Sequence, residues 1–315
     1  MPLNVMMVVQ DGRLAFEALL AATSYIPTPD TQLWLMEPQP GPLWPTDPRI
    51  ADPDIRVELE RHAQITPFDS THFGAAYPHG NKIEALCALP ANQPFIFFDT
   101  DTLFLDALPQ IDTGRPTASL RRTDSWPNIT AAGPTRAQIW RSLYQRFDLP
   151  LSVDKSYPPD DWQHYPYYNA GWFFGPCPHR FGARYIRYAT EIRADPGPAL
   201  VGQSLDPWLD QIALPLVIAA EGGGPRNVPA LDDTATCHWR TLPLAYARES
   251  DAVIARLDQI AQINRVKKLL KRYPPFHQML YRGGGAQARA LFSEDLPQDE
   301  QQIRKRLRAA NLWLR

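Results

Sequence analysis

The first hundred residues alternate between short apolar runs and segments whose apolar side chains recur at helical spacing. Residues 3–9 form a continuous apolar run that ends at Gln10-Asp11-Gly12, which is typical of a buried parallel strand and its exit loop. Further strands are predicted at 32–36, 63–67 and 94–98, and helices at 13–23, 54–62 and 81–89. Such strand–helix alternation predicts an α/β fold with a mainly parallel central sheet flanked by helices.

The remainder of the chain is less regular. Strands are predicted at 117–120 and 172–174, and helices at 136–147, 180–193 and 204–220. Beyond about residue 250 the pattern is helical and basic, with a break at three consecutive glycines. We therefore expect one α/β domain over residues 1–248, and a helical, basic C-terminal extension over residues 249–315 that packs on it.

Composition narrows the class of protein. The chain has 315 residues, of which 44% are hydrophobic and 21% charged, as in an ordinary globular enzyme. A net charge of −2 gives no reason to expect a nucleic-acid partner. No apolar run reaches the roughly 18 residues of a transmembrane helix, and the N-terminus lacks the basic start of a signal peptide. The three cysteines show no CxxC spacing, which favours reduced thiols in a cytoplasmic protein.

The clearest chemical signal follows the strand predicted at 94–98, where an FIFF run leads into Asp99-Thr100-Asp101. Ligands of open α/β sheets bind at the carboxyl ends of the strands. Residues two apart on an extended segment point the same way, so the carboxylates of Asp99 and Asp101 converge. Converging carboxylates repel each other unless a cation lies between them, and oxygen ligands suit Mg²⁺ or Mn²⁺, which would bridge to phosphate. The alternative is two acids that merely begin a loop.

A buried strand that runs into Asp-x-Asp near residue 100 resembles the GT-A nucleotide-diphospho-sugar transferases, and the glycogenin-like retaining family is the nearest. The resemblance spans roughly residues 3–245 at the level of motifs. It implies a Rossmann-like GT-A fold, Mn²⁺ or Mg²⁺ as cofactor, a nucleotide-sugar donor (a UDP-sugar before others) and a saccharide or other hydroxyl acceptor. Gln10, Asp11 and Gly12 would then bind the base and ribose of the donor, and Asp99 and Thr100 its phosphates. For the first three, a simple turn into a helix is the alternative.

Two further segments carry the resemblance. Lys82 matches a basic residue that the family presents to the diphosphate or ribose of the donor; the alternative is a solvated lysine on a helix face. Asn169-Ala170-Gly171 matches the family's Asn-Ala-Gly, where the amide and the small backbone contact the donor sugar. The alternative there is an ordinary turn into a strand, because Asn and Gly are common turn residues.

A third matching segment and a late histidine complete the implied site. Asp210 and Gln211 match an Asp-Gln pair at the start of a helix that faces the sugar, although Asp210 could equally be a plain helix N-cap. His238 is the candidate third metal ligand, with a structural histidine as the alternative. The family's following glycine and Lys-Pro-Trp are absent here, so phosphate neutralisation is open and Arg240 is a candidate substitute. Cys237 is better explained as a small buried residue than as a ligand.

Other interpretations stay open at this stage. A haloacid-dehalogenase-like phosphatase also has a strand leading into Asp-x-Asp, and a nucleotide-sugar-binding scaffold without turnover would keep the same residues. The resemblance favours retention of anomeric configuration, whereas inversion would need a carboxylate base such as Asp160, Asp161 or Asp210. The basic segment 265–272 is a candidate for peripheral membrane contact, with a solvated helix face as the alternative.

Overall fold

The computed structural model describes residues 2–120 and 123–314. A six-stranded sheet with the order β3-β2-β1-β4-β7-β6 lies at its centre. Its strands are β1 (Leu3–Val8), β2 (Thr31–Pro38), β3 (Gln64–Phe68), β4 (Phe95–Phe98), β6 (Thr117–Ser119) and β7 (Asn169–Gly175). Strands β1 to β4 pair in parallel, while β7 runs antiparallel to both β4 and β6. This mixed, mainly parallel sheet flanked by helices confirms the fold class expected from the sequence.

Both faces of the sheet are buried, which explains the continuous apolar runs of its strands. Val5 and Met7 of β1 belong to one hydrophobic core, whereas Met6 between them belongs to a second core. In β4, Phe98 lies in the first core and Phe97 in the second. Successive side chains of a strand point to opposite faces, so each strand contributes to both cores.

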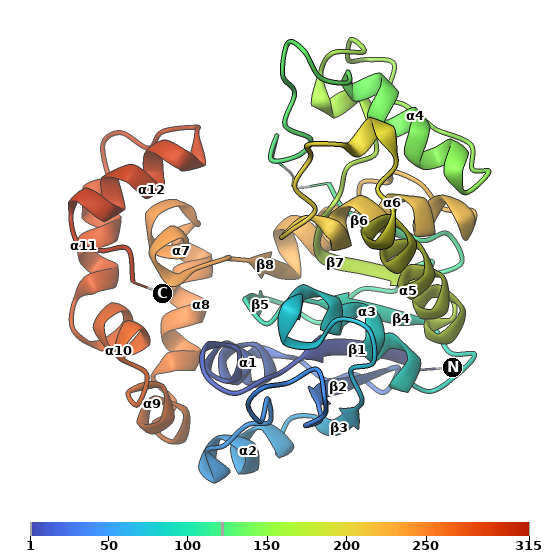
Figure 1. Cartoon of the computed structure of the whole chain (residues 1–315). Coiled ribbons are helices and arrows are strands. Elements are labelled where there is room, and N and C mark those ends of the chain that lie inside the picture. Colours follow the sequence, from blue (N-terminus) through green and yellow to red (C-terminus); the bar gives the residue numbers. More distant parts are fainter. Residues whose placement is uncertain (1, 121–122, 315) are drawn as a thin grey trace.

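Helices cover the two faces in separate groups. The first core is closed by α1 (Arg13–Ser24), α2 (Pro53–Glu60), α7 (Leu242–Arg248), α8 (Asp251–Ala261), α9 (Asn264–Leu270), α10 (Pro274–Tyr281), α11 (Gly284–Leu291) and α12 (Glu300–Ala309). The second is closed by α3 (Asn81–Glu84), α4 (Arg136–Arg146), α5 (Pro178–Ala194) and α6 (Leu209–Ala220). Figure 1 shows α7 to α12 gathered beside α1, in orange to red. The C-terminal helices therefore share a core with the first helices of the chain.

A second, two-stranded sheet was not predicted from the sequence. Strand β5 (Thr102–Phe104) pairs antiparallel with β8 (Thr236–His238), and Thr102 is the partner of His238 in the register. Each strand has only three residues, which is too short for an alternation of polar and apolar positions to be recognised. This pairing brings His238 next to the segment that contains Asp99 and Asp101.

The prediction of a helix from residue 204 was wrong at its start, since α6 begins at Leu209. Pro207 disfavours helical backbone in the residue before it, which delays the helix. The helix predicted over 81–89 is α-helical only in α3 and continues as the 3₁₀ turn Ala85–Ala88. Other short turns are 3₁₀ at Gly74–Ala76, Pro78–Gly80, Trp162–His164 and Pro198–Leu200, and π-helical at Ala230–Thr234. Within the described residues, no helix is both long and apolar enough to cross a membrane.

Candidate functional site

A cleft lies at the carboxyl ends of β1 and β4, where the chain switches from one side of β1 to the other. The chain leaves β1 to build β2 and β3 on one side and returns to β4 on the other, and such a switch point is where open α/β sheets bind ligands. The cleft has a volume of about 500 Å³. Its lining includes Gln10, Arg13, Glu17, Lys82, Asp99, Thr100, Asp101, Asn169, Ala170, Asp210, Gln211, His238, Arg240 and Arg304.

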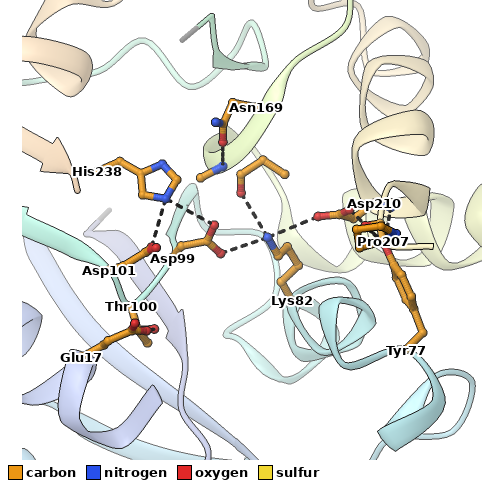
Figure 2. Close-up of polar contacts among 12 residues, drawn as sticks. Glu17, Tyr77, Lys82, Asp99, Thr100, Asp101, Asn169, Pro207, Asp210 and His238 are labelled. Atoms are coloured by element: carbon orange, nitrogen blue, oxygen red, sulfur yellow. Dashed lines mark hydrogen bonds and ion pairs between the residues drawn. The ribbon is translucent and has the colours of Figure 1, made fainter. Parts of the chain in front are cut away.

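Asp99, Asp101 and His238 converge at this cleft as a three-residue cluster. One ligand atom from each lies within 4.8 Å of the others. His238 Nε2 lies 3.0 Å from Asp101 Oδ1 and 3.9 Å from Asp99 Oδ2 (Figure 2). In spite of the 3.0 Å approach, Asp101 Oδ1 is buried without a hydrogen bond of good geometry to any described residue. An unsatisfied buried oxygen beside a second carboxylate and an imidazole nitrogen fits a divalent cation.

The charge state of Asp101 agrees with that role. Burial by itself would raise the pKa of this carboxyl, but His238, Arg13 and Lys82 together hold it below its ordinary value. Asp101 is therefore an ionised ligand near neutral pH, and the buried negative charge attracts a cation.

Gly171 makes room for the imidazole of His238. A β-carbon at this position would lie 2.2 Å from His238 Nδ1, closer than real atoms approach. The carbonyl oxygen of Gly171 also accepts a hydrogen bond from the N–H of Asp99 at 2.8 Å. The glycine thus ties β7 to the Asp99 segment and leaves space for the ring.

Lys82 connects two carboxylates that come from different elements. Its ammonium lies 2.9 Å from Asp99 Oδ1 and 3.3 Å from Asp210 Oδ2, and it donates to the carbonyl of Ala170 at 3.3 Å (Figure 2). Burial alone would lower the pKa of Lys82, but Asp99 and Asp210 outweigh it and raise that pKa, so the side chain stays protonated. The lysine is buried. The alternative of a solvated lysine on a helix face is therefore wrong.

Asp210 is a buried residue in the first turn of α6, held on several sides. Its Oδ1 accepts a hydrogen bond from the Tyr77 hydroxyl at 2.9 Å, and its N–H donates to the same hydroxyl oxygen at 2.8 Å (Figure 2). Its carbonyl oxygen accepts from Tyr185 at 2.7 Å. The residue at the N-cap of α6 is Trp208, not Asp210. The plain N-cap alternative for Asp210 is therefore wrong, and its carboxylate belongs to the cleft.

Asn169 begins β7 at the edge of the cleft. Its side-chain oxygen accepts a hydrogen bond from the N–H of Gly171 at 2.8 Å, so the amide NH₂ group is the part that remains to bind a ligand (Figure 2). Asn169 and His238 also line a neighbouring hollow of about 330 Å³. Asn169 and His238 thus line both cavities, whereas Ala170 and Gln211 line only the cleft of about 500 Å³.

Sequence reasoning missed Glu17, which lies behind the Asp99–Asp101 segment. Glu17 accepts hydrogen bonds from the Thr100 hydroxyl at 2.9 Å and from Arg13 at 2.6 Å. Burial, with the nearby charge of Asp101, raises the pKa of Glu17 to about 8, although Arg13 opposes this shift. The hydroxyl of Thr100 is thus engaged by Glu17. One acid within an otherwise apolar helix face was the only signal in the sequence.

The loop after β1 contributes one of its three residues to the lining of the cleft. Gln10 lines the cleft, whereas Asp11 and Gly12 lie beside its lining. The carboxylate of Asp11 accepts a hydrogen bond from the N–H of Ala51 at 3.1 Å. Gly12 has a φ of 76°, a left-handed conformation that lets the chain turn from the strand into α1.

Asp160 and Asp161, two of the three carboxylates considered as a base, line neither cavity. Asp161 accepts a hydrogen bond from the N–H of Gln163 and so caps a 3₁₀ turn. Of the three candidates, Asp210 is the one in the cleft.

The basic segment around α9 is partly neutralised within the molecule. Arg265 pairs with Glu58 at 2.5 Å, and Arg272 pairs with Asp52 at 2.7 Å and Asp54 at 2.6 Å. These contacts attach α9 to α2 and the residue that caps it. Two of the segment's cations therefore pair with carboxylates of the same chain. Contact of this segment with a membrane stays a prediction.

Comparison with known proteins gives the class. A family model described as the Rhodobacterales glycosyltransferase domain matches residues 5–222, which is more than half of the chain. The chain therefore belongs to this glycosyltransferase family, which confirms the class that the Asp-x-Asp resemblance implied. No curated protein matches significantly.

Two solved structures show a weak likeness. The galactosyltransferase LgtC in complex with donor and acceptor sugar analogs shares 11% identity, with a TM-score of 0.46, over 82% of this chain and 95% of that one. An active-site mutant of LgtC gives 11% identity and a TM-score of 0.41 over the same shares. At these values the assignment to a family rests on the family model.

Proposed function

We propose that this protein transfers a sugar from a nucleoside-diphosphate sugar, a UDP-sugar before others, to a hydroxyl of a saccharide or similar acceptor, and that it needs Mn²⁺ or Mg²⁺. The observation that carries the proposal is the convergence of Asp99, Asp101 and His238 at the switch point of the sheet. Membership in a glycosyltransferase family favours transfer over the phosphatase alternative.

The three residues would hold the divalent cation, which when bound supplies Lewis-acid stabilisation of the departing diphosphate. Their donor set of two carboxylate oxygens and one imidazole nitrogen suits Mn²⁺ and Mg²⁺ better than soft metals. Cys237 lies on the same strand as His238 but is buried in the first core, as the sequence predicted.

Asp210 and Asn169 are assigned to orienting the donor sugar. Both carboxylate oxygens of Asp210 already have partners, Tyr77 and Lys82, so this group is held rigidly. We therefore assign Asp210 to hydrogen bonds with sugar hydroxyls rather than to the role of base. The NH₂ group of Asn169 and the side chain of Gln211 extend that polar surface.

Lys82 contributes a fixed positive charge at the base of the cleft. Because it is shared between Asp99 and Asp210, it sets the relative position of the metal-binding segment and the sugar-binding helix. A group held in place before the substrate binds needs no reorganisation during the reaction.

The proposal is tested by thermal unfolding of the purified protein with UDP, GDP and CDP, each with and without Mn²⁺. A ligand at one hundred times its Kd adds about 2.7 kcal/mol of stability. We expect one nucleotide to raise the Tm only when Mn²⁺ is present, and Asp101→Asn to lose this effect. Asp106→Asn is the matched control, because it removes the same charge from an exposed position five residues away.

Two results would contradict the proposal. If no nucleotide shifts the Tm under any metal condition, the assignment of Asp99 and Asp101 is wrong. If a nucleotide sugar binds tightly but is neither transferred nor slowly hydrolysed, the protein is a nucleotide-sugar-binding scaffold.

The expected domain bounds and the expected location are also kept as proposals. Residues 1–248 are proposed as the transferase domain and 249–315 as the helical extension, and the match to residues 5–222 falls within the first part. The cytoplasmic location is proposed from the three cysteines, which form no disulfide in the described part of the chain.

A further inference from the structure

A cluster of arginines meets the cleft from the C-terminal part of the chain. Arg240 follows β8, Arg248 ends α7, and Arg304 lies on α12. Their guanidinium groups approach Glu300 at 3.8, 2.5 and 2.5 Å respectively. Arg248 has a second carboxylate, Glu249, at 3.2 Å.

For Arg240 and Arg304, Glu300 is the one carboxylate within 4.0 Å among the described residues. Glu300 and Glu249 are two carboxylates beside three guanidinium groups, so they do not fully neutralise them. The local charge is therefore positive.

Arg240 and Arg304 direct this excess charge into the cleft of Asp99 and Asp101, since both line it. Their side chains are only 25% and 27% exposed. The Nε atom of Arg304 is buried without a hydrogen-bond partner among the described residues. An anion in the cleft would relieve this crowding of cations.

The backbone around Arg240 is tied to the metal-binding segment. Arg240 has a φ of 62°, a left-handed conformation that is unfavourable for a non-glycine residue. A hydrogen bond from the N–H of Thr241 to the carbonyl of Trp239, at 2.7 Å, closes a tight turn around it. The N–H of Trp239 donates in turn to the carbonyl of Asp101 at 2.9 Å. The backbone at Arg240 is thus held in a fixed relation to Asp101.

We propose that Arg240 and Arg304 bind the diphosphate of the donor, so that helix α12 completes the donor site. This inference rests on the function proposed above. A guanidinium offers paired N–H donors that match two phosphate oxygens, and it is always charged. Both residues lie beyond the family match at 5–222.

The test compares Arg304→Gln with Arg308→Gln. Arg304 and Arg308 lie on the same helix, and their guanidinium groups lie 5.4 and 5.2 Å from the Trp313 ring. Arg308 is exposed and is not among the residues that line the cleft. Calorimetric titration in the presence of Mn²⁺ measures the affinity for UDP, GDP, CDP and inorganic pyrophosphate.

We expect Arg304→Gln and Arg240→Gln each to weaken the bound nucleoside diphosphate and pyrophosphate by about tenfold or more, because a charged hydrogen-bond donor to phosphate is lost. Arg308→Gln should bind as the wild type does. Arg304→Lys keeps the charge without the paired donors, so it should have intermediate affinity, and it serves as the test if Arg304→Gln does not fold.

Each outcome has a distinct meaning. Unchanged affinity in Arg304→Gln and Arg304→Lys, or an equal loss in Arg308→Gln, overturns this inference and leaves the proposed function intact. If the wild-type protein binds neither a nucleoside diphosphate nor pyrophosphate with Mn²⁺, the proposed function fails and this inference fails with it.

Discussion

The cleft has two parts with opposite charge. The acidic part consists of Asp99, Asp101 and Asp210, with Lys82 bonded among them, and it lies within the segment matched by the family. The cationic part consists of Arg240 and Arg304, which lie after that segment and share Glu300 with Arg248. The acidic part suits a metal ion and sugar hydroxyls, and the cationic part suits phosphates. A donor with both a sugar and a diphosphate would need the two parts together, although the family match covers only the first.

The two parts also differ in how they are held. The acidic side chains project from the ends of β4 and α6 and are cross-linked through Lys82 and Tyr77. The cationic side chains project from a tight turn and from helix α12 of the C-terminal region, and they share Glu300. We expect substitutions in the acidic part to affect both stability and activity, and those in the cationic part to affect affinity alone.

The largest expected effect is on activity in Asp101→Asn. The substitution removes a charged ligand atom from the cluster and keeps the shape of the side chain. Transfer or hydrolysis of the nucleotide sugar should fall by about 1,000-fold, because the charge that develops on the departing diphosphate is no longer stabilised. A steady-state assay measures this loss of activity, and its substrate is a sugar derivative of the nucleotide that thermal unfolding identifies. Activity within tenfold of the wild type would remove Asp101 from the metal site.

Lys82→Met should have the next largest effect, this time on stability. Asp99 and the buried Asp210 would lose their shared cation, and breaking a buried ion pair from one side costs about 3 kcal/mol. Denaturant unfolding measures the loss of free energy. The double variant Lys82→Met/Asp210→Asn should recover part of it, because the uncompensated buried charge is gone. Equal loss in the single and double variants would show that Lys82 acts by packing alone.

Gly171→Ala should lower the affinity for Mn²⁺ by about tenfold, which is a smaller change. The added methyl group overlaps the imidazole of His238 and displaces it from the cluster. Gly41→Ala is the control, because a β-carbon there meets no atom within 4 Å. Titration of Mn²⁺ in the presence of the nucleoside diphosphate measures the affinity. If His238 is not a ligand, Gly171→Ala and the control will bind Mn²⁺ equally.

The last expected effect is on the pH dependence of stability, through Glu17. Its folded pKa of about 8 lies above the ordinary value of 4.5, so between these pH values the folded state holds a proton that the unfolded state has lost. Stability from this group therefore falls as the pH rises from about 4.5 to 8, by at most roughly 1.4 kcal/mol per pH unit. In EDTA, the wild type should lose stability over this range relative to Glu17→Gln. Parallel pH profiles of the two proteins would contradict the raised pKa.

Much of the acidic part could be predicted from the sequence because it is attached to regular elements. The FIFF run marks a buried strand, and in an open parallel sheet the carboxyl end of such a strand lies at the ligand site. The convergence of the Asp99 and Asp101 carboxylates at that end could therefore be predicted. The helical position of Lys82 was also evident. Its burial and its contacts with Asp99 and Asp210 were not, because they depend on how α3 and α6 pack on one face of the sheet.

Of the cationic part, the sequence singled out Arg240 as a candidate but not Arg304. Arg304 lies on a polar helix with many charges, and nothing in its spacing separates it from Arg308. The pairing of β5 with β8 joins two three-residue strands from distant parts of the chain, and it is this pairing that places His238 and Arg240 beside Asp101. Such contacts follow from tertiary packing rather than from local periodicity.

The most direct test of the central claim is electron paramagnetic resonance of Mn²⁺ in the presence of the nucleoside diphosphate that stabilises the protein. Free aqueous Mn²⁺ gives a strong signal that weakens on binding. The account predicts that the wild type removes one equivalent of Mn²⁺ from solution, and that Asp101→Asn and His238→Ala each bind far more weakly while Asp106→Asn binds normally. If Asp101→Asn and His238→Ala retain wild-type affinity for Mn²⁺, then Asp99, Asp101 and His238 are not a metal site, and the proposed mechanism is wrong.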